Sequence, residues 1–320
     1  MSNRMFQGRI DLEKKKLIME FEETHPKSLA IIGYGSGIIP QDKNNPNDKK
    51  ELDLIIVVDD LEEWVKDNIK VHPEEFTEAS LKFFKKATLE NLEKGAPIIY
   101  FSRASYKGQY IKRGIISKEQ FLKSCNERSS SYVPFRLEKV TELIKCDDKE
   151  IYDALVYDHR ITLMLALLML SKEECNLYDL ITCICTMSFL GDFRMKIHCE
   201  DPNKIKNIVN KQLKYFCEDY GKVNEDYFRM VDSEQFVINY DKIASDFEIL
   251  PEKVKLLLEK YNLDGRDQVY IKKELEKFFI AESKRENFHQ MLKGIQTTGL
   301  KKSLIYGLRK LKKGMNKNVK

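Results

Sequence analysis

The chain has 320 residues, of which 42% are hydrophobic and 33% are charged, with a formal net charge of +4. That length and apolar content can fill the cores of two ordinary domains, or of one large domain with an appendage. Because the charges nearly balance, the overall composition points neither to a nucleic-acid coat nor to an enzyme for acidic substrates, so any useful charge asymmetry has to be local. We expect no nucleic-acid partner.

The first part of the chain alternates short apolar strands with helical patterns. Glycine and proline separate these segments, as at the turn over residues 95–97. We expect a compact mixed α/β domain over residues 1–120. In chain order its predicted elements are a helix over 9–23, strands over 28–33 and 52–58, a helix over 74–94, and strands over 98–102 and 110–117.

From residue 118 the pattern becomes mostly helical, which predicts a second, helical domain over 121–250 and a C-terminal region over 251–320. The predicted helices lie at 118–127, 150–171, 175–190, 202–220 and 251–261, with one strand signal at 235–240. Cys183 and Cys185 fall in this part and could suggest a metal pair. Two residues apart on a helix point away from each other, so we interpret them as buried thiols.

The most informative pattern joins a glycine loop at 33–37 to an acidic strand. Its glycines allow close backbone approach and supply amide donors for phosphate oxygens, and the Ser36 hydroxyl can hold a terminal phosphate. Glu51 and Asp53 lie two apart on a strand, share a face and can both present carboxylates to Mg²⁺. The pattern predicts a metal-dependent nucleotidyltransferase, and it resembles the polymerase-β-like fold in order and spacing.

More specific sequence matches extend over nearly the whole chain. Residues 32–38, Ile-Gly-Tyr-Gly-Ser-Gly-Ile, and 52–60, Leu-Asp-Leu-Ile-Ile-Val-Val-Asp-Asp, resemble the mitochondrial-type CDP-diacylglycerol synthase family. That family is also called the mitochondrial translocator assembly and maintenance proteins. The resemblance continues in order through residues 112–117, 135–139, 188–195, 202–209 and 293–299. The chain departs from it at 72–77, where His-Pro-Glu-Glu-Phe-Thr replaces an Asn-Pro-x-His-Tyr-Ser run.

The resemblance implies an α+β protein. Its parts would be a polymerase-β-like nucleotidyltransferase domain, a mainly helical, winged-helix-like domain and a C-terminal amphipathic helix that binds membranes. It also implies transfer of CMP from CTP to phosphatidic acid with Mg²⁺ as cofactor, giving CDP-diacylglycerol and pyrophosphate for phospholipid biosynthesis. Two alternatives stay open: a nucleotidyltransferase of the same fold with a soluble acceptor, and a non-catalytic, membrane-associated assembly factor.

The resemblance also assigns roles to individual residues. Asp53, Lys112 and Asp192 are the predicted catalytic residues, and Asp53 with Glu51 would hold the metal. Arg136 and Lys139 lie three apart, which on a helix would place them on one face suited to a triphosphate. The predicted nucleotide-binding residues are Gly35, Ser36, Lys112, Arg136 and Lys139, and the candidates for a third carboxylate are Asp192 and Asp59.

The C-terminal residues carry an apolar stripe surrounded by positive charge, with eight basic residues among the last twenty-one. This composition favours an interfacial helix that buries its apolar face in an anionic membrane over a helix that docks on the protein. The residues predicted to meet the membrane are Leu304, Leu308, Arg309, Lys310, Leu311, Lys312 and Lys313.

The N-terminal residues bear on location. No signal peptide pattern is present, and a transit peptide would be nearly free of acids, whereas five occur in the first 23 residues: Asp11, Glu13, Glu20, Glu22 and Glu23. An odd number of cysteines, seven, fits a reducing compartment. We therefore expect a bacterial member of the family that is cytoplasmic, peripheral on the inner face of the cell membrane, and free of a transit or signal peptide.

Overall fold

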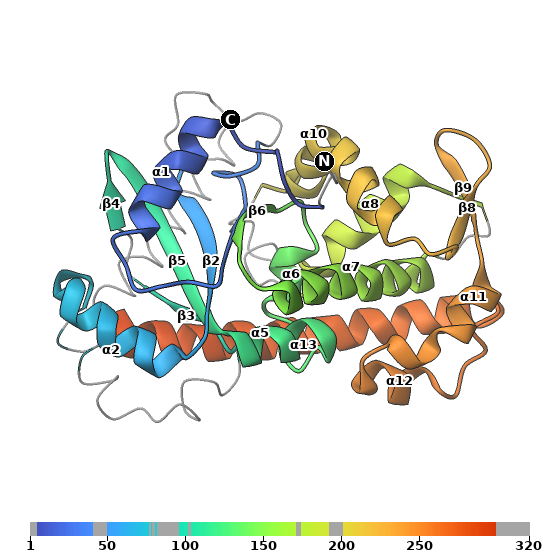
Figure 1. The fold of residues 1–320 in the computed structure, drawn as a ribbon. Helices are drawn as coiled ribbons and strands as arrows, with labels where there is room; N and C mark the ends of the chain where they lie inside the picture. The colour runs from blue at the N-terminus through green and yellow to red at the C-terminus, as the bar shows by residue number, and fades with distance from the viewer. Residues whose placement is uncertain are drawn as a thin grey trace.

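The structure is a computed structural model of the chain. It describes residues 5–40, 50–76, 78, 81, 96–101, 104–170, 174–191 and 201–298, with the backbone alone at 174 and 294–298. Figure 1 shows a mixed sheet with its helices at one end, a cluster of helices at the other, and one long helix running beneath both.

Within these ranges, six strands form one mixed sheet. They are β1 (Ala30–Tyr34), β2 (Leu52–Val58), β3 (Ile99–Tyr100), β4 (Ala104–Tyr106), β5 (Gln109–Ser117) and β6 (Glu142–Cys146). The order is β3-β5-β2-β1-β6, with β4 paired to β5 outside this path. β2 and β5 run parallel, whereas the other pairs are antiparallel. β2 is almost continuously apolar because it is central in the sheet and its side chains are buried on both faces.

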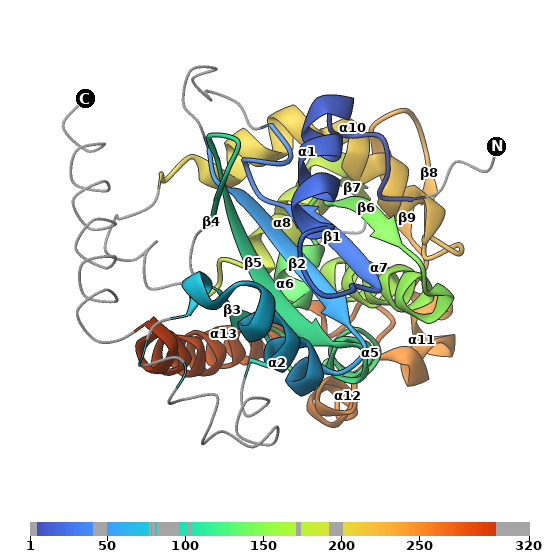
Figure 2. The ribbon, with the colours of Figure 1, turned by 60° about the vertical axis from the view of Figure 1, so that its left-hand side comes forward.

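One face of this sheet is covered by α1 (Leu12–Glu22) and α2 (Leu61–Val71), which Figure 2 shows in front of the strands. Each helix begins at an aspartate cap that accepts a backbone N–H, Asp11 in α1 and Asp60 in α2. A 3₁₀ turn, η1 (Pro73–Glu75), follows α2, and α5 (Lys118–Asn126) follows β5. The covered face is therefore closed to large ligands.

The remainder of the described chain is mostly helical. Its helices are α6 (Pro134–Leu137), α7 (Lys149–Met169), α8 (Leu177–Met187), α10 (Lys204–Lys222), α11 (Tyr240–Ser245), η2 (Phe247–Ile249) and α12 (Glu252–Leu258). A small antiparallel sheet has the order β7-β9-β8, from β7 (Glu174–Asn176), β8 (Phe228–Met230) and β9 (Gln235–Ile238). The mixed sheet together with this mainly helical part confirms the predicted α+β class.

The long helix α13 (Gln268–Thr298) joins the two ends of the molecule, as Figures 1 and 2 show. At its start, the Gln268 side chain donates to the carbonyls of Leu167, Leu168 and Leu170, which end α7. Near its other end, the buried ammonium of Lys293 donates to the carbonyl of Ala96, just before β3. α13 is thus fixed to both parts of the fold by side-chain hydrogen bonds.

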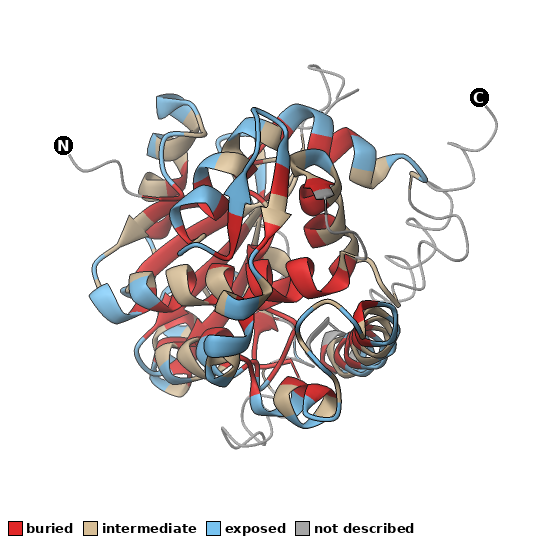
Figure 3. Ribbon diagram, turned by 90° about the vertical axis from the view of Figure 1, so that its right-hand side faces the viewer, coloured by how far each residue is buried: buried red, intermediate tan, exposed pale blue. Residues whose placement is uncertain are grey.

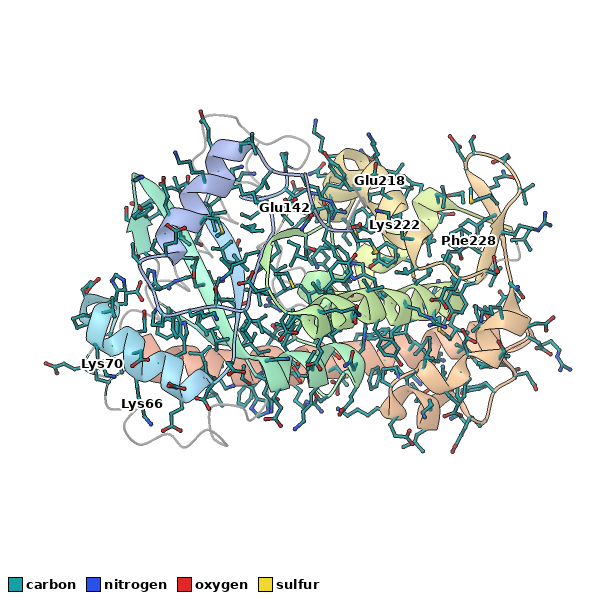
Figure 4. The ribbon with its side chains drawn as sticks, in the orientation of Figure 1. Lys66, Lys70, Glu142, Glu218, Lys222 and Phe228 are labelled. Carbon is teal, nitrogen blue, oxygen red and sulfur yellow. The ribbon has the colours of Figure 1, made fainter. Side chains whose placement is uncertain are left out.

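The segment before α1 forms a second link between the two parts. The Glu142 carboxylate on β6 accepts from the backbone N–H of Gly8 at 3.0 Å and of Arg9 at 2.8 Å. The Arg9 guanidinium in turn pairs with Asp219 of α10. Figure 4 shows Glu142 at the sheet, with Glu218 and Lys222 of α10 nearby.

Figure 3 shows that buried residues concentrate on the strands and on the helix faces turned toward them. α7 is buried from Ile161 to Met169, which explains its apolar sequence as a core helix. In the described part of the chain, no helix is both long enough and apolar enough to cross a membrane.

Several elements differ from the sequence prediction. The structure places α2 and η1 at 61–75, and most of the helix predicted over 74–94 lies outside the described residues. The short strand β4 was not predicted, nor was β6, whose residues beyond position 120 complete the sheet. The division at residue 120 stays a prediction. β6 lacks a long apolar alternation because Lys145 and Cys146 occupy its end, so its pairing with β1 identifies it.

Candidate functional site

The glycine loop makes a tight turn directly after β1. Gly35 has φ +74, a left-handed conformation that favours glycine, and its carbonyl accepts from the N–H of Ile39 at 2.9 Å. A Cβ at Gly37 would lie 2.0 Å from the carbonyl oxygen of Glu51. The loop therefore folds against the start of β2, which is possible only because these positions lack side chains.

Strand register places the predicted acid and base side by side. Asp53 of β2 lies opposite Tyr34 of β1 and is also the partner of Lys112 in parallel β5, so these three side chains share one face. Asp53 Oδ1 is 3.6 Å from Lys112 Nζ, and the side chains are 27% and 29% exposed. A Cβ at Gly35 would lie 3.2 Å from Asp53 Oδ2. The carboxylate, the ammonium and the glycine turn thus form one accessible corner.

Three tyrosines extend this corner toward α6. Lys112 Nζ lies 4.3 Å from the centre of the Tyr100 ring, a cation–π contact. The Tyr100 hydroxyl lies 3.1 Å from the Tyr34 hydroxyl and accepts a hydrogen bond from Arg136 Nε at 3.1 Å. The Arg136 guanidinium stacks on Tyr132, 3.4 Å from the ring centre. The predicted nucleotide-binding residue Arg136 is therefore connected to Lys112 through Tyr100.

Lys139 lies three residues after Arg136, but the two side chains do not share a helix face. That prediction is wrong because α6 ends at Leu137. Lys139 Nζ instead turns back to the carbonyl of Phe135 at 2.7 Å and to the Ser188 hydroxyl at 2.6 Å. Burial lowers the pKa of Lys139 to about 8. Since Ser188 is the C-cap of α8, Lys139 connects the end of α6 to the end of α8.

The described residues fit Mg²⁺ at Asp53, with Glu51 as the second candidate. Mg²⁺ usually takes one or two protein carboxylates and completes its shell with water and substrate phosphates. Glu51 is half-buried immediately before β2. Across the described ranges, no group of three or more His, Cys, Asp or Glu side chains is arranged to hold a metal. A third carboxylate is therefore not supplied by those residues.

Of the other predicted site residues, some lie within the described part of the chain and some lie outside it. Asp59 follows the far end of β2, six residues beyond Asp53, which at about 3.3 Å per residue is roughly 20 Å away. Asp192 lies outside the described residues, and so do the predicted membrane residues 304–313. Ser36 lies half-buried in the glycine loop beside Gly35, as the prediction requires.

Sequence reasoning did not find Tyr100 or Tyr132 as site residues. Tyrosine is common in strands and cores, so neither carried a local signal. Tyr34 lies inside the glycine motif, which was the only hint of its role. Their contacts with Lys112 and Arg136 are recognised only from the tertiary structure, in which β3, β5 and α6 lie together.

Comparison with known proteins identifies the family to which the chain belongs. A family described as "Phosphatidate cytidylyltransferase, mitochondrial" matches residues 15–313. The chain belongs to this family. Membership confirms the predicted resemblance, including its assignment as a nucleotidyltransferase family.

Curated relatives support the same conclusion along most of the chain. The mitochondrial phosphatidate cytidylyltransferase of Schizosaccharomyces pombe is 26% identical, covering 89% of this chain and 80% of its own length. The Bos taurus enzyme is 28% identical, covering 93% of each. A solved nucleotidyltransferase-like protein from Exiguobacterium sibiricum aligns over 87% of this chain and 78% of its own, at 10% identity and a TM-score of 0.25, which is too low to support an argument.

The comparisons correct one prediction. The expected cytoplasmic location, on the inner face of a cell membrane, is wrong because the family and these relatives are named as mitochondrial enzymes. The prediction rested on acidic residues near the N-terminus. The composition of one short segment does not determine where a protein is delivered.

Proposed function

We propose that this chain is a phosphatidate cytidylyltransferase whose reaction takes place at the corner formed by Gly35, Asp53 and Lys112. The carrying observation is the strand register that puts Asp53 and Lys112 on one face with the glycine turn beside them. A carboxylate, an ammonium and a turn without side chains suit a triphosphate and its counterion. Family membership gives CTP and phosphatidate as the substrates.

The reaction needs few groups from the protein. A phosphate oxygen of phosphatidate forms a bond to the α-phosphorus of CTP, the bond from that phosphorus to the β-phosphate oxygen breaks, and pyrophosphate leaves. A phosphate monoester loses its second proton at about pH 6, so it is already a nucleophile at neutral pH. This agrees with a corner that presents a carboxylate and an ammonium rather than a histidine.

Each described residue has a definite task in this proposal. The backbone at Gly35 and Ser36 would cradle phosphate oxygens, and Lys112 would offset negative charge that grows on the leaving group. Asp53, with Glu51 second, would hold Mg²⁺, which when bound neutralises triphosphate charge and polarises the phosphoryl oxygens. Arg136, which is held by Tyr100 and Tyr132, would contact the distal phosphates.

The decisive assay is incorporation of labelled CTP into phosphatidate by the wild-type protein and by Asp53→Ala. We expect a loss of about 10³-fold, since Asp53 both holds the metal and pairs with Lys112. Asp59→Ala is the matched control and should keep activity, because Asp59 directly follows the far end of the same strand, away from the glycine turn. Activity that survives Asp53→Ala would refute the metal assignment.

The basic, apolar C-terminal sequence supports a lipid acceptor presented at a membrane. Deletion of residues 296–320 should reduce transfer to phosphatidate in anionic liposomes far more than it reduces CTP binding. Equal losses in both measurements would contradict this part of the proposal. If the full-length chain does not bind anionic liposomes, the result would instead favour the alternative in which the acceptor is a soluble molecule.

A further inference from the structure

Glu138 is a buried carboxylate in an unusual environment. It is fully buried, and in the described part of the chain neither of its carboxylate oxygens accepts a hydrogen bond of normal geometry. Burial raises the pKa of Glu138 to about 7, although the charge of Lys139 opposes this. An ionised carboxylate is costly to bury without partners, so a residue of this kind calls for a functional explanation.

The nearest cation is the neighbouring Lys139, whose Nζ lies 3.9 Å from Glu138 Oε1. Burial lowers the pKa of Lys139 to about 8, and the carboxylate of Glu138 is the main influence that opposes the decrease. The ammonium therefore depends on Glu138 for its charge.

The charged and titratable groups around the pair come from every element packed on it. Arg136 of α6 and Lys204 of α10 disfavour the ammonium of Lys139, whereas the buried thiol of Cys185 on α8 favours it. The groups that face Glu138, besides Lys139, are Arg128, the Ser188 hydroxyl, Asp158 of α7 and Tyr220 of α10. Arg128 is paired with Asp158 at 3.0 Å, and the cation in ion-pair contact with the Glu138 carboxylate is Lys139.

Lys139 belongs to a row of cations that begins at the proposed site. Lys112 stands over Tyr100, and Tyr100 accepts from Arg136, three residues before Lys139. Lys204 continues the row, because it and Lys139 contact the same ring. Their ammonium groups lie 5.4 and 5.2 Å, respectively, from the ring centre of Phe189. Such a row suits an extended polyanion better than a single phosphate.

We propose that Glu138 is a positioning residue that sets the charge of Lys139, and that this pair takes up a proton when the triphosphate of CTP binds. The proposal rests on the proposed function. A polyanion beside Lys139 stabilises its ammonium and destabilises the Glu138 carboxylate, so both effects favour uptake. The proton comes from solvent and adds to the neutral amine of Lys139 or to Glu138, and no covalent bond to substrate is made.

The test is the pH dependence of KM for CTP between pH 7.5 and 9.5, where a terminal phosphate with a pKa of about 6 stays ionised. In the wild type, KM should rise as pH passes about 8, as Lys139 loses its proton. In Glu138→Gln, KM should already be high at pH 7.5 and change little up to pH 9.5, because the carboxylate no longer supports the ammonium and the rise falls below this range. In Lys139→Arg it should disappear, because arginine stays charged.

Glu22→Gln is the matched control. Glu22 is also a buried carboxylate whose oxygens accept no hydrogen bond in the described structure, but it lies on α1, over the opposite face of the sheet. Its substitution should leave the wild-type pH profile unchanged. A wild-type profile in folded Glu138→Gln, or a persistent rise in Lys139→Arg, would overturn the proposal.

Calorimetry of CTP binding in two buffers of different ionisation enthalpy separates this proposal from the proposed function. At pH 8 the wild type should take up roughly half a proton, since Lys139 with a pKa of about 8 is half protonated before binding. Lys139→Arg should take up clearly less, because only Glu138 can then gain a proton at this site. Uptake without any transfer to phosphatidate would refute the proposed function alone, whereas transfer without uptake would refute this inference alone.

Discussion

Two neighbouring residues of β5, Lys112 and Arg113, show how differently one strand uses its two faces. Lys112 is 29% exposed and lies 3.6 Å from the carboxylate of Asp53 at the open corner. Arg113 is 1% exposed and binds both oxygens of Glu75, each at 2.6 Å. The same kind of charge is therefore accessible for a ligand on one face and locked into the core on the other.

The covered face is built to hold its charge permanently. The guanidinium of Arg113 lies 5.0 Å from the ring centre of Phe21 and 5.8 Å from that of Trp64, so α1 and α2 close over it. His25 lies 3.2 Å from the carboxylate of Glu75 and stacks on His72 at 4.1 Å. Burial by itself would raise the pKa of Glu75, but the hydrogen bond with His25 and the charge of Arg113 lower it to about 2.

This comparison teaches that exposure, rather than residue type, separates a site residue from a structural one. Removing one member of a buried ion pair strongly destabilises the folded protein, because the other charge stays buried. A half-exposed pair contributes little to stability and leaves its charges available to a substrate. Substitutions on the two faces should accordingly affect different measurements.

The largest expected effect is on the stability of the covered face. Arg113→Met should destabilise the protein by about 3–5 kcal/mol, because the mostly buried Glu75 carboxylate loses its permanent cation and keeps only its contacts with His25 and Asn68. Chemical denaturation monitored by circular dichroism at pH 7 would measure the loss. A decrease below about 0.5 kcal/mol would show that the pair is dispensable.

Lys112→Met, one residue away, should do the reverse. We expect kcat/KM for transfer to fall about 10²-fold, because charge on the leaving pyrophosphate loses a partner. The free energy of unfolding should change by only about 0.5 kcal/mol, as for other half-exposed positions. If Lys112→Met and Arg113→Met lose stability equally, the contrast between the faces is wrong.

Glu75→Gln adds a pH dependence to the comparison. Because the pKa of Glu75 is lowered from 4.5 to about 2, its ionisation stabilises the fold above pH 4.5, and this contribution is lost as pH falls toward 2. The variant should be about 2–3 kcal/mol less stable than the wild type at pH 7. The difference should shrink in unfolding titrations between pH 4.5 and pH 2, and a gap that stays constant would contradict the assignment.

The smallest expected effect concerns the connection between Lys112 and Arg136. Tyr100→Phe keeps the ring beneath Lys112 but removes the hydroxyl that accepts from Arg136. Loss of one such hydrogen bond, about 1 kcal/mol, should raise KM for CTP roughly fivefold with little change in kcat. Tyr106→Phe, on the neighbouring strand β4, is the control and should leave KM unchanged.

The local elements of the site could be predicted from sequence. β2 was expected over 52–58 and is found there, since a run of β-branched residues between polar segments is a strong strand signal. The glycine spacing predicted the turn, and its φ of +74 at Gly35 shows why glycine is needed. Resemblance to the family added Lys112 and Arg136, which no local pattern distinguishes from surface charge.

What the sequence by itself determined was thus the turn chemistry, the periodicity and the candidate acid Asp53, because these depend on neighbours along the chain. Only the tertiary structure decided that Lys112, and not Arg113, faces Asp53, because this depends on the register between β2 and β5. It also decided which charges are buried, since Arg113 is paired with Glu75 and Glu138 lies near Asp158, and both of these groups come from other segments of the chain. Pairing and burial are long-range properties, and no local window of sequence contains them.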